Sequence, residues 1–241
     1  MGNTVIDLAS VRSVCQQCGI YKLCMPIGLQ KADLEQLDRI IKHRRPITKG
    51  EHLYRCGEEF TAIYVLRSGS AKSYLSHESG MEHVISFKLP GDLLGLSGIN
   101  GKHYTNSAIA LETSSVCDIP FTQLEQLCQE IPGIQRHILE MMSKEIQEEH
   151  EKIAVCSKLS AEARLASVLL TLSERFHQRG YSATEFNLSM SRSDIANMLG
   201  LAVETISRLF THFQEEGLIE ADRKHIKLLD MQRLSDLVKL A

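Results

Sequence analysis

Three cysteines near the amino terminus place the strongest constraint on the fold of this 241-residue chain. They follow the spacing Cys15-x2-Cys18-x5-Cys24, which is close enough for their side chains to converge on one inorganic centre. Thiolates are soft ligands that suit iron-sulfur clusters and zinc, and both centres usually take four protein ligands. A fourth ligand must therefore come from a distant part of the chain, and the fold has to bring that part back to the amino-terminal segment.

Four further cysteines are available to complete such a site, namely Cys56, Cys117, Cys128 and Cys156. Cys156 falls on the apolar seam of a predicted helix, and Cys56 and Cys128 are interpreted as ordinary thiols. Cys117 lies in the run 109–119, where a period of two places it on an apolar face with Ile109, Leu111 and Ile119. The residues alone leave a ligand and a buried small hydrophobe as equal interpretations of Cys117. The spacing also leaves both zinc and iron-sulfur chemistry open.

Composition places the chain among ordinary globular proteins of a reducing compartment. The count of seven cysteines is odd, and residues 1–12 lack the basic start, apolar middle and small-residue cleavage site of a secretory signal. No apolar run approaches the roughly 20 residues needed to cross a bilayer, so we expect a cytoplasmic protein without membrane contact. The net charge of -3 means that any DNA contact must come from locally placed cations.

The hydrophobic patterns predict an α+β chain with strands in its first half and helices after them. Apolar residues at helical spacing indicate a short helix over 32–41. From residue 47 to residue 119, short β-rich runs end at glycine turns, which is typical of an antiparallel barrel or sandwich. A long helix is expected over 132–156 and a second one over 161–178, with a domain boundary between them.

The stretch 191–209 has the pattern of a helix, a tight glycine turn and a second helix. Ser191 and Asp194 resemble a capping box at the start of the first helix, and Gly200 permits the sharp turn. Apolar residues at helical spacing supply the packing between the helices, namely Ile195, Ala196, Leu199, Leu201, Ile206 and Leu209. A predicted hairpin over 218–228 would form the wing of a winged helix-turn-helix.

Glu204, Ser207 and Arg208 share one face of the second helix because they lie at positions i, i+3 and i+4. Arginine pairs with guanine, glutamate accepts from the cytosine amino group, and serine adapts to several base edges. A solvated face with an internal Glu204–Arg208 ion pair is the alternative, but the glycine turn and the hairpin favour DNA binding. Candidate phosphate contacts are Arg192, Arg223 and Lys224.

The long helix carries an apolar seam with one charged member. The seam residues recur at spacings of three and four, as in a coiled coil, at Leu139, Met142, Ile146, Glu149, Ile153 and Cys156. In a parallel dimer Glu149 would face its own copy, and two carboxylates ~6 Å apart repel by roughly 3 kcal/mol at an effective dielectric of about 20. We therefore expect a conditional homodimer that reads a two-fold DNA site; a helix docked only on its own domain is the alternative.

Together these motifs resemble the CRP/FNR family of bacterial transcription factors, and within it the oxygen-sensing iron-sulfur regulators of the FNR type. The resemblance extends from Cys15 to beyond Arg208. It rests on the cysteine cluster with Cys117 in the run 111–117, on the recognition helix 203–208, and on the stretch 176–182. Glu149 also matches an acidic residue in the dimer helix of that family.

The resemblance implies a β-roll sensory domain of the jelly-roll type, a long dimerisation helix and a C-terminal winged helix-turn-helix. The corresponding segments are 1–30 for cluster binding, 31–131 for the β-roll, 132–158 for the dimer helix and 159–241 for DNA binding. Implied partners are double-stranded DNA with a two-fold TTGAT-type site, RNA polymerase and a second copy of the chain. The implied role is that of an activator and repressor of transcription.

The resemblance also implies a [4Fe-4S] cluster on Cys15, Cys18, Cys24 and Cys117. Without oxygen this cluster would support a DNA-binding dimer. Oxygen would convert it to [2Fe-2S], after which the dimer would dissociate and leave the promoter. A regulator of the same family with a structural zinc, or with a different small-molecule signal, is the alternative.

The cyclic-nucleotide branch of the family fits these residues less well. Its phosphate cassette carries a glutamate shortly after Gly-Asp-x-x-Gly and an arginine just before Ser-Ala. Here Leu96 follows the run 91–95, and Asn106 precedes Ser107. Because a buried phosphate needs cations and donors, no cyclic nucleotide is expected. Val203 stands where that branch tends to carry arginine, which favours an FNR-type half-site.

The sequence gives no indication of an enzyme. It contains no nucleophile–base constellation, no glycine-rich cofactor loop and no second cluster motif. A cluster enzyme or electron carrier would also leave the helix-turn-helix pattern unexplained. We therefore expect a regulator rather than a catalyst.

Overall fold

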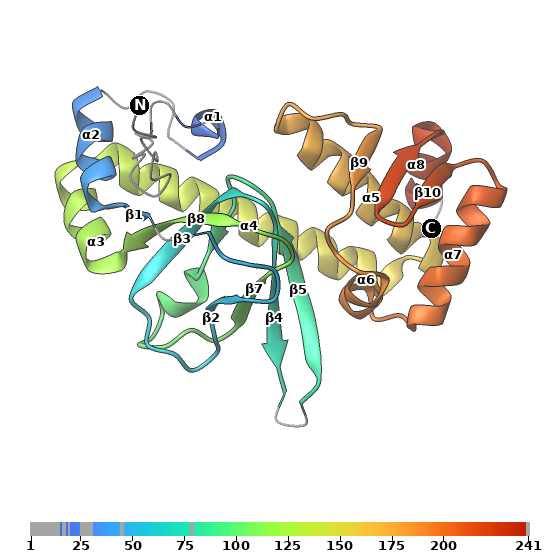
Figure 1. The fold of residues 1–241 in the computed structure, drawn as a ribbon, viewed down its shortest axis with the longest axis horizontal. Coiled ribbons are helices and arrows are strands. Elements are labelled where there is room, and N and C mark those ends of the chain that lie inside the picture. Colours follow the sequence, from blue (N-terminus) through green and yellow to red (C-terminus); the bar gives the residue numbers. More distant parts are fainter. Residues whose placement is uncertain are drawn as a thin grey trace, which may run out of the picture. The chain divides into compact units, whose positions relative to one another are not determined.

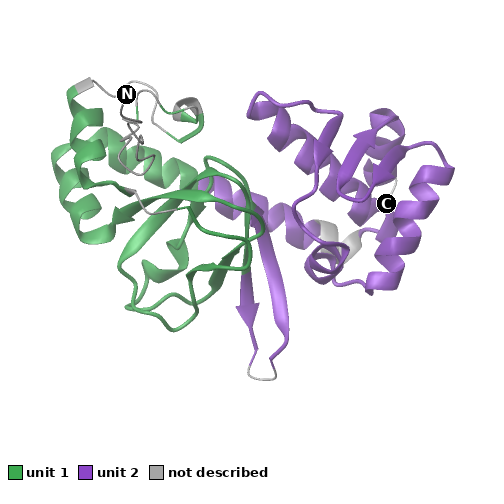
Figure 2. Ribbon diagram, viewed as in Figure 1, with its two compact units in different colours: residues 1–73, 88–141 green, residues 74–87, 142–241 purple. Residues whose placement is uncertain are grey.

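The computed structural model describes Cys15, Cys18 and residues 20–24, 31–43, 46–77 and 80–239. Most of the predicted cysteine segment 1–30 lies outside these described residues. The chain divides into two compact units, one of residues 1–73 and 88–141 and the other of residues 74–87 and 142–241 (Figure 2). None of the described helices combines the length and apolar character that crossing a membrane requires.

Two four-stranded sheets form the β-roll (Figure 1). Their strand orders are β1-β8-β3-β6 and β2-β7-β4-β5. The strands are β1 (Lys42–His43), β2 (His52–Tyr54), β3 (Ala62–Ser68), β4 (Ala71–Ser76), β5 (Glu82–Lys88), β6 (Leu93–Leu94), β7 (Ser107–Ala110) and β8 (Ser115–Pro120). β8 pairs antiparallel with both β1 and β3, and β2 pairs antiparallel with β7. The glycine-punctuated runs therefore form the β-roll that the sequence predicts.

Aromatic side chains from both sheets pack together inside the roll. Tyr54 of β2 stacks on Tyr104 with ring centroids 4.2 Å apart, and its ring centroid lies 5.7 Å from that of Tyr64 on β3. The three tyrosines are buried, and Leu66 is fully enclosed beside them. Successive side chains of a β-strand point to opposite faces of the sheet, so alternate residues of β2 and β3 point into the roll. The tyrosines fill its interior.

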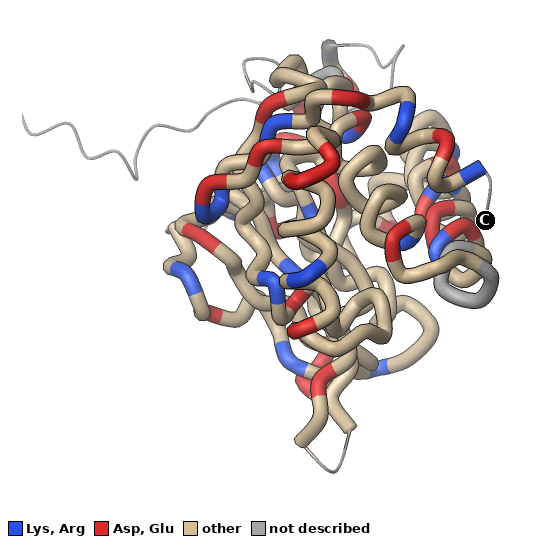
Figure 3. Tube along the Cα trace, turned by 90° about the vertical axis from the view of Figure 1, so that its right-hand side faces the viewer, with Lys and Arg blue, Asp and Glu red and all other residues tan. Residues whose placement is uncertain are grey.

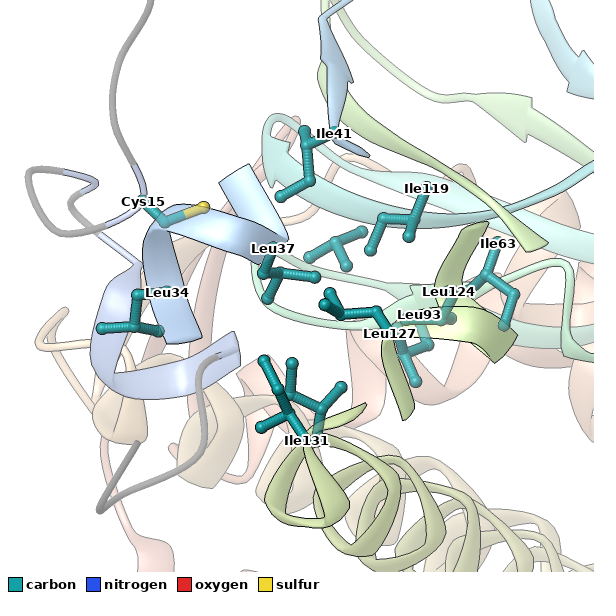
Figure 4. Packing of buried hydrophobic residues seen from close by; sticks show 12 residues of the cluster. Cys15, Leu34, Leu37, Ile41, Ile63, Leu93, Ile119, Leu124, Leu127 and Ile131 are labelled. Atoms are coloured by element: carbon teal, nitrogen blue, oxygen red, sulfur yellow. The ribbon is translucent and has the colours of Figure 1, made fainter. Parts of the chain in front are cut away.

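A second hydrophobic cluster packs helices against the first sheet (Figure 4). It joins α2 (Lys31–Ile40), β3, β8, α3 (Phe121–Glu130) and the start of α4 (Pro132–Lys158). α2 contributes Leu34 and Leu37, which lie at the helical spacing that predicted this helix. Cys15 is buried in the same cluster, at 7% exposure. The amino-terminal segment is therefore part of the core at this position.

The second unit contains the end of α4, residues 74–87 of the hairpin of β4 and β5, and the winged helix-turn-helix. Its further elements are α5 (Ala161–Gln178), β9 (Glu185–Asn187), α6 (Arg192–Leu199), α7 (Val203–Glu215), β10 (Ile219–Asp222), β11 (His225–Leu228) and α8 (Met231–Lys239). β10, β11 and β9 form an antiparallel sheet in that order. Ser160 separates the two long helices and caps α5 by accepting from the Ala163 amide. The predicted helices and the predicted wing hairpin are confirmed.

Candidate functional site

The amino-terminal cysteines are held by a short turn and a short helix beside the second hydrophobic cluster. The Cys18 amide donates to the Cys15 carbonyl at 3.1 Å, and Cys24 ends α1 (Tyr21–Cys24). Cys24 packs against the cluster that contains Cys15. Leu23 sits so close to Gly91 that a β-carbon there would lie 2.9 Å from the Leu23 Cβ. The missing side chain at Gly91 therefore makes room for the helix that carries Cys24.

Cys117 lies on β8, where its backbone is paired with β1 on one side and β3 on the other. Its partly buried side chain packs against the cluster that contains Cys15 and Ile119. Ile109 and Leu111 lie outside that cluster, so the prediction of one apolar face over 109–119 is wrong for its first part. The reason is that β7 ends at Ala110 and β8 begins at Ser115 in the other sheet.

Burial raises the pKa of three of these thiols. It is the largest cause for Cys15, Cys24 and Cys117, and the pKa of Cys24 rises to about 12 and that of Cys117 to about 11. Repulsion by neighbouring thiolates also raises these pKa values. Cys24 and Cys117 each act on the pKa of Cys15, and Cys18 acts on the pKa values of Cys24 and Cys117. Cys24 and Cys117 are therefore within electrostatic reach of each other and of both Cys15 and Cys18.

The donor set fits a metal or an iron-sulfur cluster by its chemistry, because thiolates are the soft ligands that both prefer. Within the residues that the structure describes, no three side chains of His, Cys, Asp or Glu already stand close enough to enclose an ion. Binding would therefore require the thiols to converge and to lose their protons. The four-cysteine ligand set stays a prediction.

Asp38 on α2 is a neighbour of the thiols that the sequence reading missed. Its Oδ1 accepts a hydrogen bond from the Cys15 amide at 3.2 Å. After burial, Asp38 is the next cause that raises the pKa of Cys15, through a hydrogen bond and its charge. The sequence does contain a signal for this contact: Asp38 directly follows the buried Leu37 and so lies beside the apolar face of α2.

The helix-turn-helix has the local geometry that its residues predict. Ser191 Oγ accepts from the Asp194 amide at 3.0 Å, and the Asp194 carboxylate accepts from the Ser191 amide at 2.9 Å. This reciprocal pair is the capping box expected at the start of α6. Gly200 has a φ of 64°, a left-handed conformation that favours glycine, and it ends α6. The helices pack through buried side chains, namely Ile195, Ala196, Leu199 and Ile206.

Glu204, Ser207 and Arg208 are all exposed on α7, so the predicted face points outward. No ion pair joins Glu204 to Arg208 among the described residues, and both charged heads are available to a partner. The Ser207 hydroxyl donates to the Val203 carbonyl at 2.9 Å, a bond within its own helix. The face therefore offers one acceptor group and one five-donor guanidinium, which suits base edges in a major groove.

The three candidate phosphate contacts have different surroundings. Arg192 lies over Phe210 with its guanidinium carbon 3.1 Å from the ring centroid, and burial lowers its pKa to about 10. Arg223 and Lys224 are exposed at the turn between β10 and β11, and Arg223 has a φ of 53°. Basic and acidic positions are interspersed along the described chain (Figure 3). Local cations such as those of the wing must therefore supply any contact with phosphate.

The seam of α4 is exposed along much of its length. Leu139, Ile146 and Ile153 are 58%, 55% and 66% exposed, which is unusual for large apolar side chains. Met142 is half-buried, and the side chain of Cys156 lies outside the described part of the chain. Glu149 Oε1 is 2.5 Å from the Lys152 Nζ of the same helix. The sequence reading missed this ion pair, which lowers the repulsion expected between two copies of Glu149.

Two family models match the chain. Residues 163–237 match the Crp-like helix-turn-helix domain, and residues 44–131 match the cyclic nucleotide-binding domain. The first region contains the helix-turn-helix and its wing, and the second contains nearly all of the β-roll. The two matches together cover more than half of the chain.

Curated relatives are similar over nearly the whole chain. The transcriptional activator protein anr of Pseudomonas aeruginosa is 43% identical over 230 residues, which are 95% of this chain and 94% of that protein. The fumarate and nitrate reduction regulatory protein of Escherichia coli is 44% identical over 223 residues, which are 92% and 89% of the two chains. Among solved structures, FixK2 from Bradyrhizobium japonicum matches with a TM-score of 0.75 and 27% identity, covering 82% of this chain and 97% of that one.

The surroundings of the cysteines predict their reactivity in the metal-free, reduced protein. Iodoacetamide reacts with the thiolate form, so the raised pKa values should slow alkylation at pH 8 relative to exposed Cys56, by roughly a hundredfold for Cys117 and roughly a thousandfold for Cys24. Time-resolved peptide mass spectrometry measures the three rates in one sample. Equal rates for Cys117 and Cys56 would contradict the buried position of Cys117. The urea-unfolded protein is the control, because unfolding exposes all three thiols.

Proposed function

Because the chain belongs to the CRP/FNR family of transcription regulators, we propose that it controls transcription in response to oxygen through an iron-sulfur cluster. Cys15, Cys18, Cys24 and Cys117 would hold the cluster. Segment 1–30 would serve cluster binding, 31–131 sensing, 132–158 dimerisation and 159–241 DNA binding. Its role in anaerobic regulation is supported by relatives named as transcriptional activators and anaerobic regulatory proteins.

The observation that carries this proposal is that Cys15, Cys24 and Cys117 pack against one hydrophobic cluster although Cys117 is distant in the sequence. When bound, a [4Fe-4S] cluster supplies a centre that oxygen converts to [2Fe-2S]. The protein's part is to present four thiolates from a segment and a strand, and to limit water access by burial. Asp38 orients the chain at Cys15 through the amide hydrogen bond.

The same hydrophobic cluster contains the beginning of the proposed dimer helix. Ile134 of α4 is buried in it, and Ile138 and Met141 pack against it. A change in the position of Cys15 or Cys117 would therefore alter the packing around the first turns of α4. Close-packed cores transmit such displacements because they contain little free volume. This continuity gives the cysteine site a physical route to the dimer seam.

We propose that the seam Met142, Ile146, Glu149 and Ile153 forms a homodimer whose stability is close to balance. Exposed Ile146 and Ile153 favour association, because burying them removes apolar surface from water. Glu149 opposes association by facing its own copy. Its pairing with Lys152 reduces that opposition, although ion pairs this exposed contribute only about 0.2–1 kcal/mol. A small change at the cysteines would then shift the dimer equilibrium.

We propose double-stranded DNA with a two-fold TTGAT-type site as the target of the dimer. Glu204, Ser207 and Arg208 would read base edges, and Arg223 and Lys224 of the wing would contact phosphates. Their exposure supports these roles. RNA polymerase is the further partner that transcription activation requires.

Cyclic nucleotides are not expected as the signal. The interior of the roll is filled by the stacked side chains of Tyr54, Tyr64 and Tyr104. Asn106, which stands where an arginine would hold the phosphate, accepts a hydrogen bond from Ser97 at 2.7 Å. Neither residue carries a charge that could balance a phosphate.

The ligand set is tested by metal analysis of protein purified without oxygen. The proposal predicts about four irons and four sulfides per chain, and a visible absorption that changes in air. Cys117→Ser should lose most of the iron, whereas Cys56→Ser, which changes an exposed thiol, should keep it. Zinc without sulfide would refute the oxygen-sensing proposal and would instead indicate a regulator with a structural zinc.

The charge at the seam predicts opposite effects of two substitutions. Glu149→Ala should strengthen the dimer in air by on the order of 1 kcal/mol, because it removes the repulsion between copies. Lys152→Ala should weaken the anaerobic dimer, because Glu149 loses its neutralising partner. Sedimentation velocity at several concentrations measures both shifts. Glu151→Ala, which removes the same charge from an exposed position off the seam, is the control, and equal dimerisation of all three variants would refute the role of Glu149.

The exposed face of α7 predicts a specific loss on mutation of its arginine. Arg208→Ala should lower the affinity for the target site by roughly 1–3 kcal/mol and relax the preference at one base pair. Fluorescence anisotropy with a set of half-site variants measures both effects. Arg55→Ala, which removes an exposed cation from the β-roll, controls for net charge. An unchanged preference across the variants would remove Arg208 from base recognition.

A further inference from the structure

The outer strand of one sheet is bound by a side chain of the helix-turn-helix. β5 stands at the edge of the sheet β2-β7-β4-β5, and an edge strand presents unpaired backbone donors and acceptors. The Val84 amide donates to Asn197 Oδ1 at 2.6 Å, and Asn197 Nδ2 donates to the Glu82 carbonyl at 2.7 Å. One carboxamide on α6 therefore pairs with the strand as a neighbouring strand would.

A second hydrogen bond joins the same strand to the helix before α6. Arg175 of α5 donates from its guanidinium to the Phe87 carbonyl at 2.9 Å. β5 is thus held at three backbone groups by two side chains of the DNA-binding region. Val84 is only 2% exposed, so its amide is shielded from water and takes its hydrogen bond from the protein.

Apolar packing between the strand and these helices is incomplete. A half-open cavity of about 910 Å³ lies within this unit, and β5, α4, α5 and α6 all contribute to its wall. Its apolar lining includes Phe87 from the strand, Val168 and Leu172 from α5, and Met198 from α6. Close-packed contacts fix a geometry without hydrogen bonds. Where this cavity separates the strand from the helices, the directional hydrogen bonds to β5 help to set the geometry.

The position of Asn197 connects this contact to the DNA-reading face. α6 is fixed at its start by the capping box and packs on α7 through the fully buried Ile195 and Ile206. At the other side of the contact, the hairpin continues along the chain into Ser73 and Lys88 of the first unit. Asn197 thus stands between a strand of the β-roll and the helix that carries Arg208.

We propose that Asn197 is a positioning residue, which ties β5 to α6 and thereby sets the orientation in which α7 meets DNA. This role rests on the proposed DNA-binding function. Both polar groups of the Asn197 side chain are hydrogen-bonded to the backbone of β5, and Asn197 lies on the helix before the recognition helix. It therefore acts on DNA binding through α6.

The contact is tested first by hydrogen exchange of the full-length, metal-free protein. Asn197→Ala removes both bonds, and Asn197→Asp keeps the acceptor for Val84 while placing an oxygen against the Glu82 carbonyl. In both variants the peptide 82–87 should exchange at least about tenfold faster, and peptides of α5 and α7 should be unchanged. Asn187→Ala and Asn187→Asp change an exposed asparagine of β9 in the same two ways and serve as controls.

Affinity for double-stranded DNA, measured on the same full-length variants, tests the positioning role. Both Asn197 variants should bind severalfold more weakly than the wild type while losing only a few degrees of thermal stability, and both Asn187 variants should bind normally. Unchanged exchange at 82–87 would refute the contact, and faster exchange with wild-type affinity would refute the positioning. Wild-type protein that binds no DNA would overturn the proposed function and the positioning together, while the exchange experiment would still decide the contact.

Discussion

Burial of three thiols against one hydrophobic cluster is the constraint on which the rest of the proposed mechanism depends. Cys15 lies inside that cluster, and Cys24 and Cys117 pack against it. Burial is the main reason that their pKa values are raised, so these three thiols retain their protons at neutral pH in the metal-free protein. Because α4 begins in the same cluster with Ile134, the cysteines and the dimer helix share one core.

Each later step uses an interaction of modest strength, which suits a switch. The seam of α4 combines exposed apolar side chains with a carboxylate that Lys152 partly neutralises. α6 and α5 are tied to β5 by hydrogen bonds of one carboxamide and one guanidinium. Differences of about 1.4 kcal/mol, a tenfold change in an equilibrium, would be enough to move either contact.

The sequence predicted those features that depend on local spacing. The capping box at Ser191, the turn at Gly200 and the outward face of Arg208 follow from residue types three or four positions apart. The prediction of one continuous apolar face through Cys117 was wrong in its first part. An alternation of apolar residues does not reveal that the chain crosses to the other sheet between Ala110 and Ser115. Asp38 and Asn197 were missed because their partners lie 23 and 113 positions away, and no local pattern encodes such contacts.

In the proposed mechanism, the state of the cysteine site controls the dimer. The most direct test follows the visible absorbance and the sedimentation of one anaerobic sample as oxygen is added in steps. The dimer fraction should fall in parallel with the change in cluster absorbance. A protein that stays dimeric after its absorbance has changed would contradict this mechanism, because the cysteines and the seam of α4 would then be independent.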